Sequence, residues 1–238
     1  MKNKMLVFRA VAAFAASVVL IFFCVSRAQS ATATPLNAVS LFDGKTLNGW
    51  LMFPPNSWIV KDGAMASTGA GRGYIYPVND YTNYRLMFTM RHVSVSGGNK
   101  DHQACILIFC VRPVEGQKAP DALAGVQLQV PNGGHWDYRK GHNNGGAGEF
   151  TSPPHSQKFD VHQWSRIEVL VNADAGTARM AVAQPVGTKA VEVLDFKVPG
   201  SGLKGPFAWQ MHNAGLFDEY KDIQVEVNPT VNDLITTK

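Results

Sequence analysis

Apolar and polar residues alternate in short stretches along most of the chain. In Tyr84–Val93, every second residue from Tyr84 to Met90 is apolar, so these side chains share one face of a strand. Ala104–Val111 is a continuous apolar run, which is typical of a central strand covered on both faces. Further strands are predicted at Trp58–Ala66, Val126–Val130, Trp164–Val171, Thr177–Ala183, Ala190–Phe196, Phe207–His212 and Ile223–Val227. No stretch after residue 30 has a convincing helical period. The pattern therefore predicts an all-β fold, an antiparallel β-sandwich.

The domain boundaries follow from composition. Residues 1–30 combine a basic start, an uncharged apolar run and the small residues Ala28 and Ser30, and they predict a secretory signal peptide. An uncleaved membrane anchor is the alternative. We expect residues 31–39 to be a linker, residues 40–228 the sandwich and residues 229–238 a loose tail. The protein is then exported, to the periplasm or outside the cell.

Net charge argues against a polyanionic partner. The leader holds four of the 22 basic residues and no acidic one, so the chain without it has 18 basic and 18 acidic residues. A neutral domain predicts no nucleic-acid partner and no stable membrane insertion after cleavage. The oligomeric state is left open.

Two cysteines remain after the leader, Cys105 and Cys110. Their offset of five places them on opposite faces of a strand and about 16 Å apart. That is too far for a bond between them, so we expect two buried thiols.

Gly125–Glu149 combines a strand with a polar loop. Gln127 and Gln129 alternate with apolar residues and share the other face. The chain then turns at Pro131–Gly134 into a loop rich in histidine, aspartate and aromatic residues. Such a strand and loop suit a small-molecule site, although a solvated strand and surface loop would look the same. By the same alternation Gln210 and His212 share one face of Phe207–His212.

Several motifs in this order resemble the 3-keto-disaccharide hydrolase domain family. The resemblance covers residues 40–227 and is carried by Leu41–Trp50 (LFDGKTLNGW), Trp58–Gly63 (WIVKDG), Tyr84–Arg91, Gln163–Ile167 (QWSRI), Gly205–His212 (GPFAWQMH) and Tyr220–Val225 (YKDIQV). It implies a concanavalin A-like jelly roll, two curved sheets with a sugar site on the concave face. It also implies cleavage of glycosides that carry a ketone at C3. In that chemistry a base removes the C2 proton, the enolate expels the aglycone from C1, and water adds to the enone.

The candidate site residues follow from this chemistry. His212 is the leading base because imidazole titrates near neutrality; a strand-end histidine bound to backbone or solvent is the alternative. The further catalytic candidates are His135 and Glu149, and the sugar-binding candidates are Gln127, Gln129, Gln210, Trp136, Tyr138 and Arg91. Asp137 and His142, with His135 and Glu149, are weak candidates for a divalent metal that polarises the ketone. Their spacing matches no tight ligand motif, and no cofactor is required by the sequence.

Two departures from the family pattern bear on catalysis. Gln127 and Thr89 stand where relatives usually carry an acid. A neutral amide cannot act as a base, whereas it can still bind a hydroxyl group. The sequence therefore predicts a carbohydrate-active enzyme, with a non-catalytic carbohydrate-binding domain as the alternative.

Overall fold

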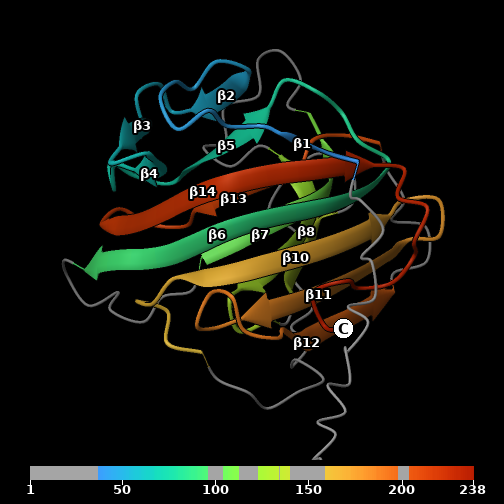
Figure 1. The fold of residues 1–238 in the computed structure, drawn as a ribbon. Coiled ribbons are helices and arrows are strands. Elements are labelled where there is room, and N and C mark those ends of the chain that lie inside the picture. Colours follow the sequence, from blue (N-terminus) through green and yellow to red (C-terminus); the bar gives the residue numbers. More distant parts are fainter. Residues whose placement is uncertain (1–36, 96–103, 113–122, 134, 140–158, 198–203) are drawn as a thin grey trace, which may run out of the picture. The chain divides into compact units, whose positions relative to one another are not determined.

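The computed structural model describes residues 37–95, 104–112, 123–133, 135–139, 159–197 and 204–238, which form two antiparallel sheets (Figure 1). The eight-stranded sheet contains, in spatial order, β12 (Val191–Lys197), β11 (Thr177–Ala183), β10 (Ser165–Asn172), β6 (Asn83–Val95), β14 (Leu216–Val227), β4 (Ala64–Ser67) and β3 (Trp58–Lys61), and β1 (Ala38–Ser40) also pairs with β14. The six-stranded sheet contains β2 (Trp50–Phe53), β5 (Gly73–Pro77), β13 (Ala208–Met211), β7 (Ala104–Val111), β8 (Ala124–Val130) and β9 (His135–Arg139).

The predicted all-β sandwich is confirmed. The described residues contain no helix, and so none that could cross a membrane. The predicted signal peptide lies outside the described residues.

One hydrophobic core joins the inner faces of the two sheets. Its centre is Trp209 of β13, which is fully buried. The Trp209 ring lies 5.3 Å from Phe88 of β6 and 4.7 Å from Tyr220 of β14, measured between ring centroids. It also stacks on Trp50 of β2 at 5.4 Å. Aromatic pairs of this kind add about 0.5–1.5 kcal/mol each to the burial of their apolar area, so Trp209 ties four strands of both sheets together.

Local sequence patterns set most of the strands. The Asp62-Gly63 turn closes the predicted hairpin of β3 and β4, and both residues have positive φ (50° and 75°), as a type I′ turn requires. β7 lies between β13 and β8, as expected for its apolar run. β14 begins at Leu216, seven residues before the predicted start. The sequence pattern misses these first seven residues because Asp218 and Glu219 are charged, although both are buried in the structure.

Two predictions within the six-stranded sheet are wrong. His135–Arg139, expected to be a loop, form β9, which pairs with β8. Cys105 and Cys110 do not lie on opposite faces. A bulge between Ile108 and Val111, with Phe109 at φ 53°, turns both Ile108 and Phe109 to the core. Cys110 then packs with Leu107, on the face that carries Cys105. Both cysteines are buried thiols outside any disulfide, as predicted.

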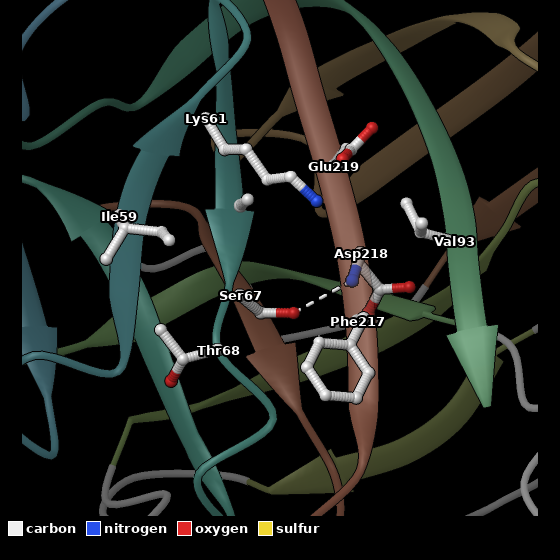
Figure 2. A pocket seen from close by; sticks show the side chains of 9 residues that line it. Ile59, Lys61, Ser67, Thr68, Val93, Phe217, Asp218 and Glu219 are labelled. Atoms are coloured by element: carbon white, nitrogen blue, oxygen red, sulfur yellow. Dashed lines mark hydrogen bonds between the residues drawn. The ribbon is translucent and has the colours of Figure 1, made fainter. Parts of the chain in front are cut away.

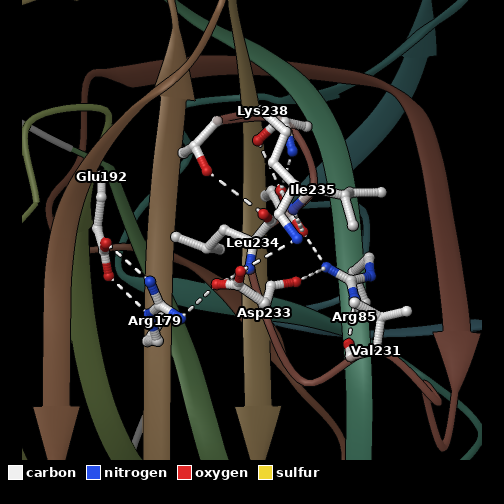
Figure 3. A network of polar contacts seen from close by, with 11 residues as sticks. Arg85, Arg179, Glu192, Val231, Asp233, Leu234, Ile235 and Lys238 are labelled. Carbon is white, nitrogen blue, oxygen red and sulfur yellow. Dashed lines mark hydrogen bonds and ion pairs between the residues drawn. The ribbon is translucent and has the colours of Figure 1, made fainter. Parts of the chain in front are cut away.

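The expectation of a loose tail is also wrong. Residues 231–238 pack onto the outer face of the eight-stranded sheet, where Leu234 is fully buried (Figure 3). The Arg85 guanidinium of β6 donates to the carbonyl oxygens of Val231 (2.6 Å) and Asp233 (2.9 Å). At the other end of the expected domain, β1 begins at Ala38, inside the predicted linker.

A buried ion pair underlies this C-terminal segment. Arg85 pairs with Glu168 of β10, and both side chains are fully buried. The Glu168 carboxylate also accepts hydrogen bonds from the backbone amides of Ile235 (3.1 Å) and Thr236 (2.9 Å). Charges removed from water need such partners, so the segment and the pair depend on each other. Alternation placed Arg85 away from the core, but nothing in the local sequence shows that the last eight residues cover it.

Replacing Arg85 tests this dependence. Arg85→Met leaves the Glu168 carboxylate buried without its counter-ion, and we expect the free energy of unfolding to fall by about 3–5 kcal/mol. Arg112→Met is the matched control: Arg112 pairs with Asp80 at 2.7 Å, away from the C-terminal segment, and its side chain is 32% exposed. A partly exposed pair of this kind is expected to contribute about 0–1 kcal/mol. Urea denaturation measures both, and equal losses would contradict the dependence.

A second test asks whether the charge of Asp233, in the C-terminal segment, stabilises the fold, and it uses the dependence of stability on pH. A hydrogen bond from Arg179, followed by one from Lys238, lowers the pKa of Asp233 from 3.8 to about 2. A lowered folded-state pKa means that the Asp233 carboxylate stabilises the fold above the unfolded pKa, and that this contribution is lost as the pH falls towards about 2. The gap in denaturation midpoint between wild type and Asp233→Asn should be constant near neutrality and close below about pH 4. A difference in midpoint that is as large near pH 2 as at neutral pH would show that the charge of Asp233 is not what stabilises the fold.

Candidate functional site

The outer face of the six-stranded sheet, which points away from the core, gathers the predicted glutamines. Strand register places residues in rows across this face. One row runs from Phe53 (β2) through Tyr74 (β5), Gln210 (β13) and Cys105 (β7) to Gln129 (β8). In the next row Leu107 of β7 is the partner of both Ala208 and Gln127, and Gln127 is also paired with Asp137 of β9.

The core decides that these amides face outward. Trp209, Leu128 and Val126 are fully buried between the sheets. Because side chains alternate along a strand, Gln210 must then point away from the core, and so must Gln127 and Gln129. The structure thus brings together the three glutamines that alternation assigned to two separate strands.

Gln127 is the most unusual residue of the face. Its side chain is 1% exposed, and neither its amide nitrogen nor its amide oxygen has a hydrogen-bond partner among the described residues. An unsatisfied buried polar group costs about 1–3 kcal/mol. Gln210 is equally buried, and Gln129 is partly exposed. A buried amide without a partner on a face with two more amides is the arrangement expected of a polar ligand site.

Sequence reasoning missed the aromatic half of the same face. Phe53 and Tyr74 stack at 5.8 Å between ring centroids, and the Tyr76 ring is 5.6 Å from Tyr74. The strands approach closely here, because a Cβ atom on Gly73 would lie 2.1 Å from the carbonyl oxygen of Phe53. The alternation of Gly73–Pro77 (GYIYP) was the available signal: Ile75 enters the core and both tyrosines face outward.

An arginine fixes the edge of this aromatic half. The Arg112 guanidinium carbon lies 5.4 Å from the centroid of the Tyr76 ring. Its Nε donates to Asp80 at 2.8 Å, and one terminal nitrogen donates to the carbonyl oxygen of Val78 at 2.6 Å. Arg112 is therefore held in place against Tyr76, and its charge is balanced by Asp80.

His212 follows Gln210 by two residues, just beyond the end of β13. It is partly exposed, and its Nδ1 lies 3.0 Å from the side-chain oxygen of Asn213. If Nδ1 carries the proton donated in this bond, Nε2 is the basic nitrogen. The structure thus puts His212 at the end of the strand that carries Gln210.

The remaining candidates of the predicted loop are only partly placed. β9 positions the backbone of His135, Trp136, Asp137 and Tyr138 beside β8. His142 and Glu149 lie outside the described residues, and the roles of all six stay predictions. In the described part of the chain, no three His, Cys, Asp or Glu side chains are close enough to hold a metal ion.

Arg91 does not join the glutamines. It lies in β6 of the eight-stranded sheet, and its neighbour Met90 faces the core, so Arg91 points out on the opposite side of the sandwich. There it forms an ion pair with Glu219 at 2.8 Å and stacks on Trp164 at 4.5 Å. Sequence alternation gives the face of a strand, but not the sheet to which it belongs.

Thr89 lies on this same outer face of the eight-stranded sheet, and its hydroxyl accepts a hydrogen bond from Arg166 at 3.3 Å. Thr89 stands where the family pattern has an acid. Because this position lies on the eight-stranded sheet, the change removes no carboxylate from the sheet face that carries the three glutamines. Of the two departures from the family pattern, only Gln127 changes the chemistry beside Gln129 and Gln210.

A hollow of about 420 Å³ lies on the eight-stranded sheet, between β3 and β6 (Figure 2). Its walls include Ile59, Lys61 and Phe217. Its two carboxylates already have partners: Asp218 is 2.8 Å from Nδ1 of His92, and Glu219 pairs with Arg91. The described residues that line the hollow include no predicted site residue and no amide side chain.

Comparisons with known proteins agree with this fold. The family model of 3-keto-alpha-glucoside-1,2-lyase-like domains matches residues 37–226. No curated protein matches the chain. A candidate glycosyl hydrolase from Parabacteroides distasonis ATCC 8503 has a similar structure, with a TM-score of 0.56 and 16% identity over 81% of this chain and 94% of that one.

Two similar structures are of other kinds. The exoplasmic/lumenal domain of VIP36, in a form with Ca²⁺ and mannose bound, has a TM-score of 0.53 and 11% identity over 80% of this chain and 87% of its own. The carbohydrate-binding module CBM66 from Bacillus subtilis has a TM-score of 0.50 and 11% identity over 75% of this chain and 95% of its own. At these identities the likeness concerns the fold.

Gln127→Leu tests whether the buried amide serves the fold. Since the amide has no partner in the described structure, an apolar side chain of similar size should leave the free energy of unfolding unchanged or raise it, by up to about 1–3 kcal/mol. Gln184→Leu is the matched control, because the Gln184 amide donates to the backbone carbonyl oxygen of Asp160 (2.7 Å) and to the hydroxyl of Ser165 (2.8 Å). The control should lose about 1 kcal/mol in urea denaturation. A clear loss of stability in Gln127→Leu would show that the amide is structural.

Proposed function

Because this chain belongs to the family of 3-keto-alpha-glucoside-1,2-lyase-like domains, we propose that it binds glycosides on the outer face of the six-stranded sheet and cleaves those oxidised to a ketone at C3. The observation that carries this proposal is Gln127, a buried amide without a partner among the described residues, on the same sheet face as Gln129 and Gln210. The mannose-bound form of the similar VIP36 domain adds support for a sugar ligand.

Amide side chains suit sugar hydroxyl groups. Each glutamine offers both a donor and an acceptor, as does each hydroxyl group. A sugar bound over β13 and β8 would supply the Gln127 amide with the partner it lacks. The fold then keeps a costly buried group because its partner arrives with the ligand.

Cleavage uses the acidity created by the ketone. Nε2 of His212 removes the proton from C2, and the electron pair of that C–H bond forms the enolate with the C3 oxygen. The enolate then expels the aglycone from C1 as the C1–O bond breaks, and the aglycone oxygen takes up a proton. Water adds to the enone at C1, so the net reaction is hydrolysis. The –NH₂ group of a glutamine donates to the C3 oxygen as negative charge develops there.

Gln127 cannot serve as the base that removes the C2 proton. An amide does not accept a proton at neutral pH, so His212 carries this role alone among the residues at this face whose side chains are described. A divalent metal that polarises the ketone is an optional addition, held by side chains of the His135–Glu149 stretch. We also propose that residues 1–30 direct export, so that the reaction takes place in the periplasm or outside the cell.

A second function is favoured by the same residue. If relatives use the acid at the position of Gln127 as their base, this chain binds sugars without cleaving them. The likeness to the module CBM66 fits that function.

Turnover separates the two functions. Purified protein is incubated with 3-keto-glycosides and their unoxidised parents, with added divalent metal or with chelator, and the released aglycone is measured. Enzymatic function predicts release from the 3-keto compounds only, and His212→Ala should lower kcat by about 10²- to 10⁴-fold. His162→Ala is the control histidine, because His162 contacts the backbone oxygen of His92 in the eight-stranded sheet. Binding without release would identify a binding domain, and the absence of both would refute the proposal.

A further inference from the structure

We propose that the aromatic half of the outer face, over β2 and β5, is an aglycone subsite that prefers a flat aryl ring to a second sugar. The inference rests on the proposed function. It assigns the glycone to the amides of β13 and β8, and the aglycone to the rings of Phe53 and Tyr76.

The spacing of the strands sets the length of the ligand. Neighbouring strands lie about 4.8 Å apart, so the three steps from Tyr74 on β5 to Gln129 on β8 span about 14 Å. Tyr74 and Gln129 share one row through Gln210 and Cys105. A single sugar ring cannot reach both ends of that row, whereas a two-ring glycoside can.

The chemistry of the two halves differs. The amides all lie on β13 and β8, whereas the described side chains of β2 and β5 on this face are apolar or aromatic, and their only polar groups are the phenolic hydroxyls of Tyr74 and Tyr76. Arg112, the charged side chain at Tyr76, is already bound to Asp80 and to the Val78 carbonyl oxygen. A sugar placed here would find only these two hydroxyls on the strands and would bury most of its own hydroxyl groups without partners from them, which is costly. An aryl ring has no such groups and gains from stacking on aromatic side chains.

The boundary between the two halves lies where the glycosidic bond would be cleaved. β13 is the strand on which the amides meet the aromatic residues, since Gln210 is the partner of Tyr74. His212 follows two residues later on the same strand end. A ligand with its sugar over β13 and β8 and its aryl ring over β5 has its glycosidic bond near β13, which is where a base must act.

Tyr76 and Phe53 are the two rings that can be reached. Both are partly exposed, whereas Tyr74 between them is buried. Arg112 covers Tyr76 at 5.4 Å and restricts its movement, so it acts as a positioning residue. A ring that is already held loses little freedom when a ligand stacks on it.

The test compares three unoxidised probes that are not cleaved: phenyl α-glucoside, methyl α-glucoside and maltose. Titration calorimetry on the full chain should show the phenyl compound binding about 2- to 10-fold more tightly than the other two, the range expected of one aromatic pair. Tyr76→Leu should abolish this preference and leave the affinity for methyl glucoside unchanged. Arg112→Gln should reduce the preference without removing it. The control Ile59→Ala, in the hollow of the other sheet, should change nothing.

Each outcome is decisive. If the phenyl and methyl glucosides bind equally, or if Tyr76→Leu weakens both alike, the aglycone subsite is refuted while sugar binding stands. Tighter binding of maltose would identify a second sugar subsite instead and also refute the proposal. If neither these probes nor 3-keto-glycosides bind, the proposed function fails as well. Denaturation midpoints of the variants show whether a lost preference reflects a damaged fold.

Cys105 locates the bound probe. It is 5% exposed and lies in the row between Gln210 and Gln129. Burial raises the pKa of the other thiol of the sandwich, Cys110, well above its usual value, so that thiol reacts slowly. Phenyl α-glucoside should slow the iodoacetamide modification of Cys105 as read by peptide mass spectrometry. Unchanged modification at saturating probe would place the sugar away from the amides, and would refute the proposed function together with the subsite that rests on it.

Discussion

The burial of Trp209 is the constraint on which the candidate site depends. Its indole ring packs against Phe88 and Tyr220 of the opposite sheet and against Trp50 of its own. A ring of this size cannot turn outward without leaving a large cavity, which would cost several kcal/mol (about 3–5). Since the pleat alternates, the position of Trp209 in the core fixes Gln210 on the outer face.

The outer face that results is chemically divided. Aromatic residues occupy β2 and β5, and amides occupy β13 and β8, in rows that continue from one half to the other. Gln127 is buried there at a cost to stability, without a partner in the described structure. Groups that cost stability and serve no internal contact are characteristic of binding sites, where the ligand completes the hydrogen bonds.

The eight-stranded sheet has a different role. Its charged side chains largely bind one another: Arg85 pairs with Glu168 beneath the C-terminal segment, and Arg91 pairs with Glu219 beside the hollow. These contacts join strands that are distant in the sequence and hold the last residues on the sheet. Through the shared core, this sheet packs against the strands that carry the amides.

The sequence by itself determined the all-β sandwich, most strands, and the sharing of one strand face by Gln127 and Gln129, because alternation and turn chemistry are local properties. Tertiary structure decided which strands are neighbours. It separated Arg91 and Thr89 from the glutamines, although their alternation is equally clear, and brought Phe53, Tyr74 and Tyr76 to them. It also turned Cys110 through a bulge and placed residues 231–238 on Arg85. Pairing between distant strands is set by how the core packs, and alternation along one strand contains no information about its neighbours.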